Sequence, residues 1–366
     1  MAAAKRILVR LGLVLGYVLV TLLILEVTAR ISAPASVFTP LLPLFPNGKA
    51  VLDVDLRGVS RHGRLTTNRW GLRGEEPPEP WDAWETWVVV GGSTTQCFYL
   101  DDEKTWPHLL QQRLREGNPR TWVGNGGIDG QTTRAHLVFM EKVVRTVRPD
   151  AVLFLLGVND FSLSICQDRR LFGNPQDRGA WSEDSWRMRL FRWSRLFRLG
   201  YRWSIALSGD VLLVRAAHRN YEPRPLGPDP TPLPADPREI LPGLPEFRSN
   251  LKALIDAGRE IGVRTVFLTQ PILFADAEPW RGIEGEFFWI RRPIARFSAA
   301  DLRRMLDVFN RETLEVCRAE GVPCFDLAAE VPSSEELYYD PAHFTEEGAA
   351  LVAEKVAAFL AASPRR

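Results

Sequence analysis

Short, strongly apolar runs that stop at glycine or asparagine are the feature that most constrains the fold of this 366-residue chain. Two of them are "TWVVVGG", with a β-branched run from Thr86 to Val90, and "AVLFLLGVND", which begins at Ala151. Runs of this length and hydrophobicity are typical of strands buried on both faces, as in a parallel sheet. Three further strands are expected in "TWVGNGG", "VRTVFLTQP" and "PCFDLA".

Segments with helical signals separate these strands. A threonine cap, a proline in the first turn and a glycine stop predict a helix over 105–117. The stretch 134–150 is expected to contain a second helix that ends before Pro149, and other helices are expected at about 246–261, 300–320 and 345–361. Strands that alternate with helices predict an α/β domain of three layers, α/β/α, with a five-stranded parallel sheet and right-handed crossovers.

The N-terminus carries a candidate membrane segment. Lys5, Arg6 and Arg10 precede an uncharged apolar run that ends at Leu25. As a helix, residues 7–25 would span about 28 Å, close to the thickness of a bilayer core. The basic flank predicts a single-pass anchor in the inner (cytoplasmic) membrane, with the N-terminus inside and the α/β domain outside, in the periplasm or the extracellular space.

A cleaved signal peptide is the alternative for this segment. The sequence "VTA" that ends at Ala29 is an acceptable cleavage site, and cleavage would yield a secreted protein. Glu26 and Arg30 directly follow the apolar run and favour a retained anchor.

The chain is therefore expected to have three parts. Residues 1–28 form the cytoplasmic start and the transmembrane signal-anchor, and residues 29–84 form a linker and irregular segment with room for short strands. Residues 85–362 form the α/β domain, with insertions at about 166–245 and 273–298. The first insertion contains "WRMRLFRWSRLFRLGYRW". This stretch is either a cap over the site, with solvated arginines, or a basic amphipathic element on the membrane surface.

The four cysteines and the net charge limit the compartment and the partners. Disulfides persist outside the cytoplasm, so Cys317 with Cys324 and Cys97 with Cys166 are the favoured pairs, and four free thiols are the alternative. A formal net charge of +1 gives no basic excess for binding nucleic acid.

Polar residues follow the predicted strands at the edge where parallel sheets bind ligands. Ser93 follows the first strand in "GGSTT", Gly127 follows the second in "NGG", and Asn159 follows the third in "GVND". After the fifth strand, "DPAH" supplies Asp340 and His343.

These residue types are the parts needed for acyl transfer. Ser93 needs a neutral imidazole to take its proton, and His343 needs the Asp340 carboxylate to fix its tautomer. The Ser93 N–H, the Gly127 N–H and the Asn159 amide are the candidate oxyanion donors, with Gly126 as the neighbouring alternative to Gly127.

The four blocks together resemble the SGNH (GDSL-type) hydrolase superfamily, in a membrane-anchored, bacterial-type form. The resemblance covers roughly residues 85–362 outside the insertions. It implies a flavodoxin-like α/β/α fold and a catalytic Ser93, Asp340 and His343. One departure is Gly92, which stands where the family has aspartate. "GGSTT" also lacks the second glycine of the α/β-hydrolase elbow, which excludes that competing fold.

The other four histidines, His62, His108, His136 and His218, have no partners at metal-ligand spacing and are expected to be structural or solvated. No metal or organic cofactor is implied. The predicted function is an extracytoplasmic serine esterase that hydrolyses an acyl ester, with an acetyl ester on a cell-surface glycan or lipid as one option. The alternatives are an O-acyltransferase acting on cell-surface polysaccharide and an inactive, membrane-anchored binding or scaffold protein.

Overall fold

The computed structural model describes residues 2–32, 46–165, 186–200, 212–217, 232–273, 297 and 299–362. The chain forms two compact units. The larger unit comprises Val37–Arg178 and Val211–Arg366, and the smaller unit comprises Met1–Ser36 and Gly179–Asp210. Both sheets described here belong to the larger unit.

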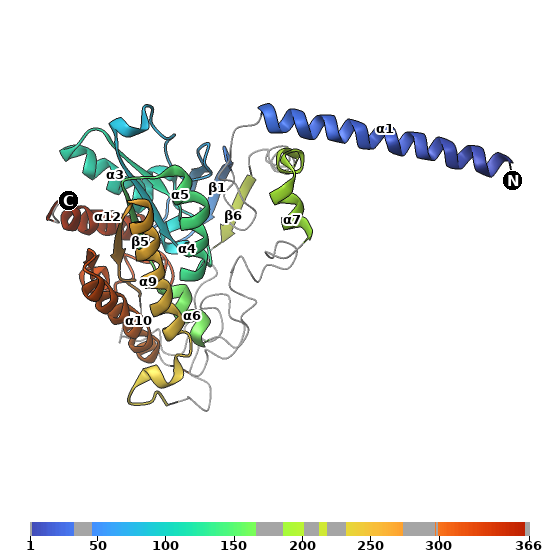
Figure 1. Cartoon of the computed structure of the whole chain (residues 1–366). Coiled ribbons are helices and arrows are strands. Elements are labelled where there is room, and N and C mark those ends of the chain that lie inside the picture. Colours follow the sequence, from blue (N-terminus) through green and yellow to red (C-terminus); the bar gives the residue numbers. More distant parts are fainter. Residues whose placement is uncertain are drawn as a thin grey trace. The chain divides into compact units, whose positions relative to one another are not determined.

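The main sheet has five parallel strands, which confirms the predicted architecture (Figure 1). The strands are β3 (Glu85–Gly91), β4 (Thr121–Asn125), β5 (Ala151–Leu155), β7 (Arg264–Leu268) and β8 (Cys324–Phe325). They lie in the order β4-β3-β5-β7-β8. Val89 pairs with both Asn125 and Leu153, so the carboxyl ends of the three strands next to Ser93 meet at one edge.

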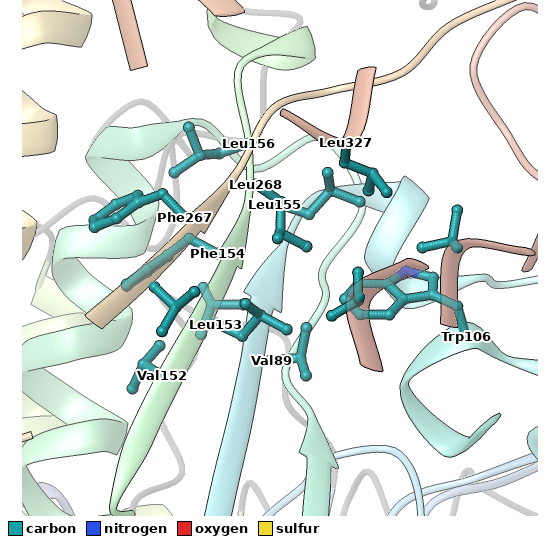
Figure 2. Packing of buried hydrophobic residues seen from close by; sticks show 14 of the residues in the cluster. Val89, Trp106, Val152, Leu153, Phe154, Leu155, Leu156, Phe267, Leu268 and Leu327 are labelled. Atoms are coloured by element: carbon teal, nitrogen blue, oxygen red, sulfur yellow. The ribbon is translucent and has the colours of Figure 1, made fainter. Parts of the chain in front are cut away.

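Apolar side chains on both faces of this sheet form the core (Figure 2). Phe154 and Phe267 stack on one side of the strands, with ring centroids 5.0 Å apart, and Trp106 lies on the other side. All three side chains are fully buried. Burial on both faces is the physical reason that the strand sequences are continuously apolar rather than alternating.

Helices cover the two faces in two groups. They are α3 (Trp106–Gly117), α4 (Thr133–Phe139), α9 (Leu244–Ile261), α10 (Ala299–Glu320) and α12 (Glu346–Ala362). Helix α3 contacts α12, whereas α9 contacts α4 and α10. This division follows from right-handed crossovers, because α3 joins β3 to β4 in one direction across the sheet and the other connections run in the opposite direction.

The helix expected over 134–150 is interrupted. A π-helical turn, η3 (Met140–Val144), separates α4 from α5 (Arg145–Val147). Arg148 then adopts a left-handed conformation with φ of 50°, which ends the helix before Pro149 as predicted.

A second, three-stranded sheet lies where a linker was expected. Strand β1 (Lys49–Asp55) pairs antiparallel with β2 (His62–Thr66) and parallel with β6 (Leu212–Ala217), which comes from the first insertion. Leu52 and Val54 of β1 are buried. Residues 46–84 therefore fold as part of the larger unit, and short strands occur within 29–84, where the sequence predicted a linker and irregular segment with room for them. Most of the second insertion, 274–296, lies outside the described residues.

The smaller unit contains the N-terminal helix α1 (Ala2–Ser32) and α7 (Trp186–Trp193), followed by helical residues 195–200. Within α1, Val9–Ser32 is long and apolar enough to cross a membrane, with a mean hydropathy of 2.3. The predicted membrane segment therefore forms a continuous helix.

Of the two predicted disulfides, one is confirmed and one is wrong. Cys317 and Cys324 form a disulfide, as expected. Cys97 is a buried free thiol, so the predicted pairing of Cys97 with Cys166 is wrong. Cys97 instead lies against the Thr94 carbonyl in the core, and Cys166 lies outside the described residues.

Candidate active site

The residues singled out after the strands all lie at the carboxyl edge of the main sheet. Ser93 is the first residue of α2 (Ser93–Gln96), a single helical turn that follows β3. Asn159 lies in the first turn of α6 (Val158–Ile165), directly after β5. Asp340 and His343 lie in the loop between α11 (Leu327–Glu330) and α12.

Ser93, His343 and Asp340 form one continuous hydrogen-bonded chain. The Ser93 Oγ lies 2.7 Å from His343 Nε2, and His343 Nδ1 lies 2.5 Å from Asp340 Oδ2. The other carboxylate oxygen of Asp340 accepts the N–H groups of Ala342 and His343, each at 2.8 Å. The carboxylate is thus fixed by its own loop while it orients the imidazole, the geometry required of a Ser-His-Asp triad.

The pKa of the His343 imidazole is higher than burial alone would make it. Burial lowers the pKa of His343, but the charge and hydrogen bond of Asp340, together with the charge of Asp129, outweigh it and raise the pKa above the ordinary 6.5. The ring also stacks on Tyr339, with centroids 5.5 Å apart and planes 7° apart. A base that is held in place and has a raised pKa suits proton abstraction near neutral pH.

Asn159 lies close to the serine turn. Its Nδ2 donates to the Gln131 carbonyl at 2.8 Å, which leaves the second N–H of the amide for another acceptor. A Cβ at position 92 would lie 2.4 Å from this nitrogen, so a side chain at Gly92 would displace the amide. The glycine that departs from the family pattern is therefore required by the local packing.

Asp160, next to Asn159, ties α6 to the start of α4. Its carboxylate accepts the Thr133 hydroxyl at 2.5 Å and the Thr133 N–H at 3.1 Å. Burial raises the pKa of Asp160 to about 7, although the hydrogen bonds from Thr133 act against this. The contact holds the turn that presents the Asn159 amide.

Gly127 occupies a different position from the one expected of an oxyanion donor. Its N–H donates to the Asn125 side-chain oxygen at 2.9 Å, and a Cβ there would lie 2.2 Å from the Gln96 nitrogen. The glycine allows close packing against α2, and its N–H is already used. Gly126 is no better placed, because its N–H donates to the Val89 carbonyl.

Arg73 and Asp102 are site residues that the sequence did not reveal. Both side chains are buried and joined by an ion pair of 2.7 Å. The Arg73 guanidinium also donates to the carbonyls of Gln96 and Cys97, at 2.9 and 2.7 Å, and to that of Leu100. It therefore satisfies the carbonyls at the end of α2 and holds the turn that carries Ser93.

No signal in the sequence distinguished Arg73. It lies in "NRWGLRG", within the proline-, glycine- and arginine-rich segment, where its burial could not be expected from composition.

The remaining histidines were predicted to be structural or solvated. His62 is exposed, and His136 is buried against Phe154, with ring centroids 6.4 Å apart. Burial lowers the pKa of His136 to about 4. His218 lies outside the described residues.

Comparisons with known proteins agree with this geometry. Residues 89–351 match the model of the GDSL-like Lipase/Acylhydrolase family. An arylesterase from Vibrio mimicus is 37% identical over 76 residues, and the esterase TesA from Pseudomonas aeruginosa is 33% identical over 76 residues. Each match covers 21% of this chain and 38% of the relative, so the chain matches well under half the length of these proteins.

Solved structures show a distant likeness. The acetylxylan esterase Axe2 from Geobacillus stearothermophilus is 14% identical, with a TM-score of 0.44 over 77% of this chain and 97% of that one. A GDSL-like lipase from Bacteroides thetaiotaomicron is also 14% identical, with a TM-score of 0.42 over 78% of this chain and 93% of that one. The family match covers most of the chain and includes every predicted block. The chain therefore belongs to the GDSL-like lipase/acylhydrolase family.

Proposed function

We propose that this protein is a membrane-anchored, extracytoplasmic serine esterase that uses Ser93 as nucleophile, His343 as general acid and base, and Asp340 to orient His343. The observation that carries the proposal is the 2.7 Å separation of Ser93 Oγ and His343 Nε2, with Asp340 on the other ring nitrogen. Ser93 lies near the start of the domain and His343 lies near its end. Side chains with a purely structural role would rarely need to meet in this way.

The reaction begins when His343 removes the proton from Ser93 and the serine oxygen attacks the ester carbonyl. His343 then protonates the leaving alcohol as the bond to it breaks, which leaves an acyl group on Ser93. Water attacks this acyl-enzyme and gives its proton to His343. The acid is released and the serine is restored.

Two donors support the oxyanion in this proposal. They are the N–H of Ser93 and the second N–H of the Asn159 amide. The Gly127 N–H is not counted as a third donor, because it donates to the Asn125 side chain.

The compartment is part of the proposal. Basic residues precede the apolar part of α1, and by the positive-inside rule they support a topology with the N-terminus inside the cell. The disulfide between Cys317 and Cys324 supports an oxidising environment for the catalytic domain. Protease added to intact spheroplasts is expected to digest the catalytic domain and spare the first residues of α1.

The direct test of the nucleophile is labelling with a fluorophosphonate probe. The wild-type protein should be labelled, and the Ser93→Ala variant should not. Ser162→Ala, which alters a buried serine on α6, is the matched control and should label normally. A wild type that resists labelling while folded would reject the nucleophile assignment. In a crystal of the labelled protein, the phosphonyl oxygen should lie roughly 2.7–3.1 Å from the Ser93 nitrogen and from the Asn159 Nδ2.

The acyl and alcohol parts of the substrate are assigned by turnover. A panel of short- and long-chain p-nitrophenyl esters and acetylated glycans defines the acyl group and the alcohol. A labelled acyl donor incubated with and without polysaccharide separates hydrolysis from transfer. We expect the label to appear as free acid in both cases, and label on the polysaccharide would favour the acyltransferase.

A further inference from the structure

The loop between β4 and α4 runs beside the catalytic groups. The Ile128 N–H donates to the Gly91 carbonyl at 3.0 Å, at the end of the strand that leads into α2. Three residues later, the Gln131 carbonyl accepts the Asn159 amide at 2.8 Å. Asp129 therefore lies between a contact with the nucleophile side of the site and a contact with the proposed oxyanion donor.

The main chain of Asp129 is held in place, while its side chain is exposed. The Asp129 N–H donates to the Gln96 side-chain oxygen at 3.1 Å, and Gln96 is the last residue of α2. Among the residues that the structure describes, the Asp129 carboxylate has no hydrogen-bond or ion-pair partner. A fixed backbone thus carries an unpaired negative charge on the loop that borders the site.

The charge of Asp129 acts on two rings of the site. Burial lowers the pKa of His343, but the charge and hydrogen bond of Asp340 and the charge of Asp129 outweigh it. Burial raises the pKa of Tyr99, and the charges of the same two carboxylates raise it further. Tyr99 lies 6.2 Å from Tyr339, whose ring stacks on His343. Asp129 is therefore close enough to the catalytic base to act on a substrate bound there.

The other charges around the site are paired. The Asp340 carboxylate is used by the His343 ring and by two N–H groups of its own loop. Arg73, the cation that holds the end of α2, is matched by Asp102 at 2.7 Å. An anionic substrate would therefore meet the charge of Asp129 without a free cation from either of these pairs to offset it.

We propose that Asp129 is a specificity-determining residue that selects against ester substrates with a negative charge beside the scissile bond. The inference rests on the proposed esterase function and narrows its substrate class. Neutral acyl esters, such as acetylated sugars without acidic groups, fit this rule, whereas esters next to a phosphate or carboxylate do not. The same repulsion favours departure of the acid product, which leaves as a carboxylate at neutral pH.

Matched pairs of esters test the proposal with the full chain in detergent. On the acyl side, p-nitrophenyl hexanoate is compared with mono-p-nitrophenyl adipate, which adds a terminal carboxylate. On the alcohol side, methyl 4-acetoxybenzoate is compared with 4-acetoxybenzoate. The quantity measured is kcat/KM of the neutral ester divided by that of the charged ester. Both esters of a pair depend on His343, so a change in its pKa cancels in this ratio.

Asp129→Asn should lower the ratio about tenfold in at least one pair, the size expected for two unit charges roughly 8 Å apart near a protein surface. The pair that responds identifies the side of the ester that faces Asp129. Added salt should also lower the ratio of the wild type, because the carboxylate is exposed and screened, and should change that of Asp129→Asn much less.

Two variants serve as controls for the loss of charge. Asp129→Glu keeps the carboxylate and should keep the wild-type ratio. Asp82→Asn removes an exposed carboxylate from η1 (Trp81–Ala83), which precedes β3 at the opposite edge of the sheet, and should also keep it. A ratio that Asp129→Asn leaves unchanged in both pairs would overturn the proposal, and so would a wild-type ratio that is independent of salt.

Turnover of the neutral ester reports on the proposed function separately. If this turnover is lost in Ser93→Ala while Asp129→Asn keeps the wild-type ratio, the esterase assignment stands and only the selection by charge is rejected. Turnover that persists in Ser93→Ala would instead reject the proposed nucleophile, and the role of Asp129 beside it.

Discussion

Arg73 and Asp102 form a buried ion pair through which the N-terminal segment holds the end of α2, the turn that carries Ser93. The Arg73 Nε lies 2.7 Å from Asp102 Oδ1, while the rest of the guanidinium is used by main-chain carbonyls at and after the end of α2. Asp102 also accepts the hydroxyl and N–H of Thr66 in β2. The small sheet and the turn that carries Ser93 therefore share one polar network.

The first prediction concerns this network. Arg73→Leu leaves the buried Asp102 carboxylate without its ion-pair partner and removes the guanidinium that donates to the Gln96 and Cys97 carbonyls, so the free energy of unfolding should fall by about 3–5 kcal/mol. Urea denaturation of the larger unit measures the loss. Arg73→Lys should recover only part of it, because a single ammonium cannot reproduce the planar fork.

Arg69→Ala is the matched control for Arg73. Arg69 is partly exposed and pairs with Glu79 at the surface, so its loss should change the unfolding free energy by about 1 kcal/mol or less. If Arg73→Leu had an equally small effect, the ion pair would not be what holds α2 in place.

The second prediction concerns the oxyanion. In the proposed mechanism Asn159 donates to the oxyanion, so Asn159→Ala should lower kcat by about 10²–10³-fold with little change in KM. Steady-state kinetics with a p-nitrophenyl ester measure both constants. Ser162→Ala lies on the same helix and should keep the wild-type kcat. A kcat within fivefold of the wild type in Asn159→Ala would remove this residue from the mechanism.

The third prediction is the pH dependence of the activity. His343 must be neutral to accept the serine proton, and its pKa is raised, so kcat/KM should fall as the pH drops through a value above 6.5. The same raised pKa means that protonated His343 stabilises the fold below pH 6.5, and that this contribution is lost as the pH rises through the pKa of the folded state.

Asp129 gives this prediction a specific variant. Its negative charge raises the pKa of His343, so Asp129→Asn should move the acidic limb of kcat/KM to lower pH without altering the plateau. Glu141→Gln, which removes an exposed carboxylate from η3, should leave the limb in place. A limb that stays fixed in Asp129→Asn would show that another group controls it.

The fourth prediction concerns acid stability. Burial lowers the pKa of His136 to about 4, whereas an unfolded histidine titrates near 6.5, so the unfolded chain binds more protons between these values. Stability should therefore be lost as the pH falls from 6.5 to 4, by about 3 kcal/mol for this residue. His136→Phe should lack this loss.

The comparison must be made between variants, because Asp160 titrates in the same range with the opposite sign. Its raised pKa, about 7, makes the folded state bind more protons than the unfolded state. Denaturation of the wild type and His136→Phe at each pH cancels that contribution. His62→Gln, which replaces an exposed histidine, is the control. Parallel stability curves for His136→Phe and the wild type would contradict the assignment to His136.

The main sheet and the meeting of Ser93, Asp340 and His343 could be predicted because each depends on local pattern plus one topological rule. A continuous apolar run identifies a buried strand, and parallel strands bring the residues that follow them to one edge. Neither step requires knowledge of side-chain packing.

Other features depended on contacts that spacing does not encode. Gly127 looked suitable as a donor, but its N–H is used by Asn125 two residues earlier in the chain. Cys97 is shielded in the core rather than paired with Cys166. The pairing of β1 with β6 could not be predicted, because Ala50 and Leu212 lie far apart in the sequence.

That last pairing also sets an order of events during folding. The β1–β6 contact closes a very long loop, so its entropic cost is met only after much of the main sheet has formed. Until β6 has been synthesised, β1 has one edge uncovered. Such an exposed edge is a site of intermolecular pairing, so misassembly between newly made chains should begin there.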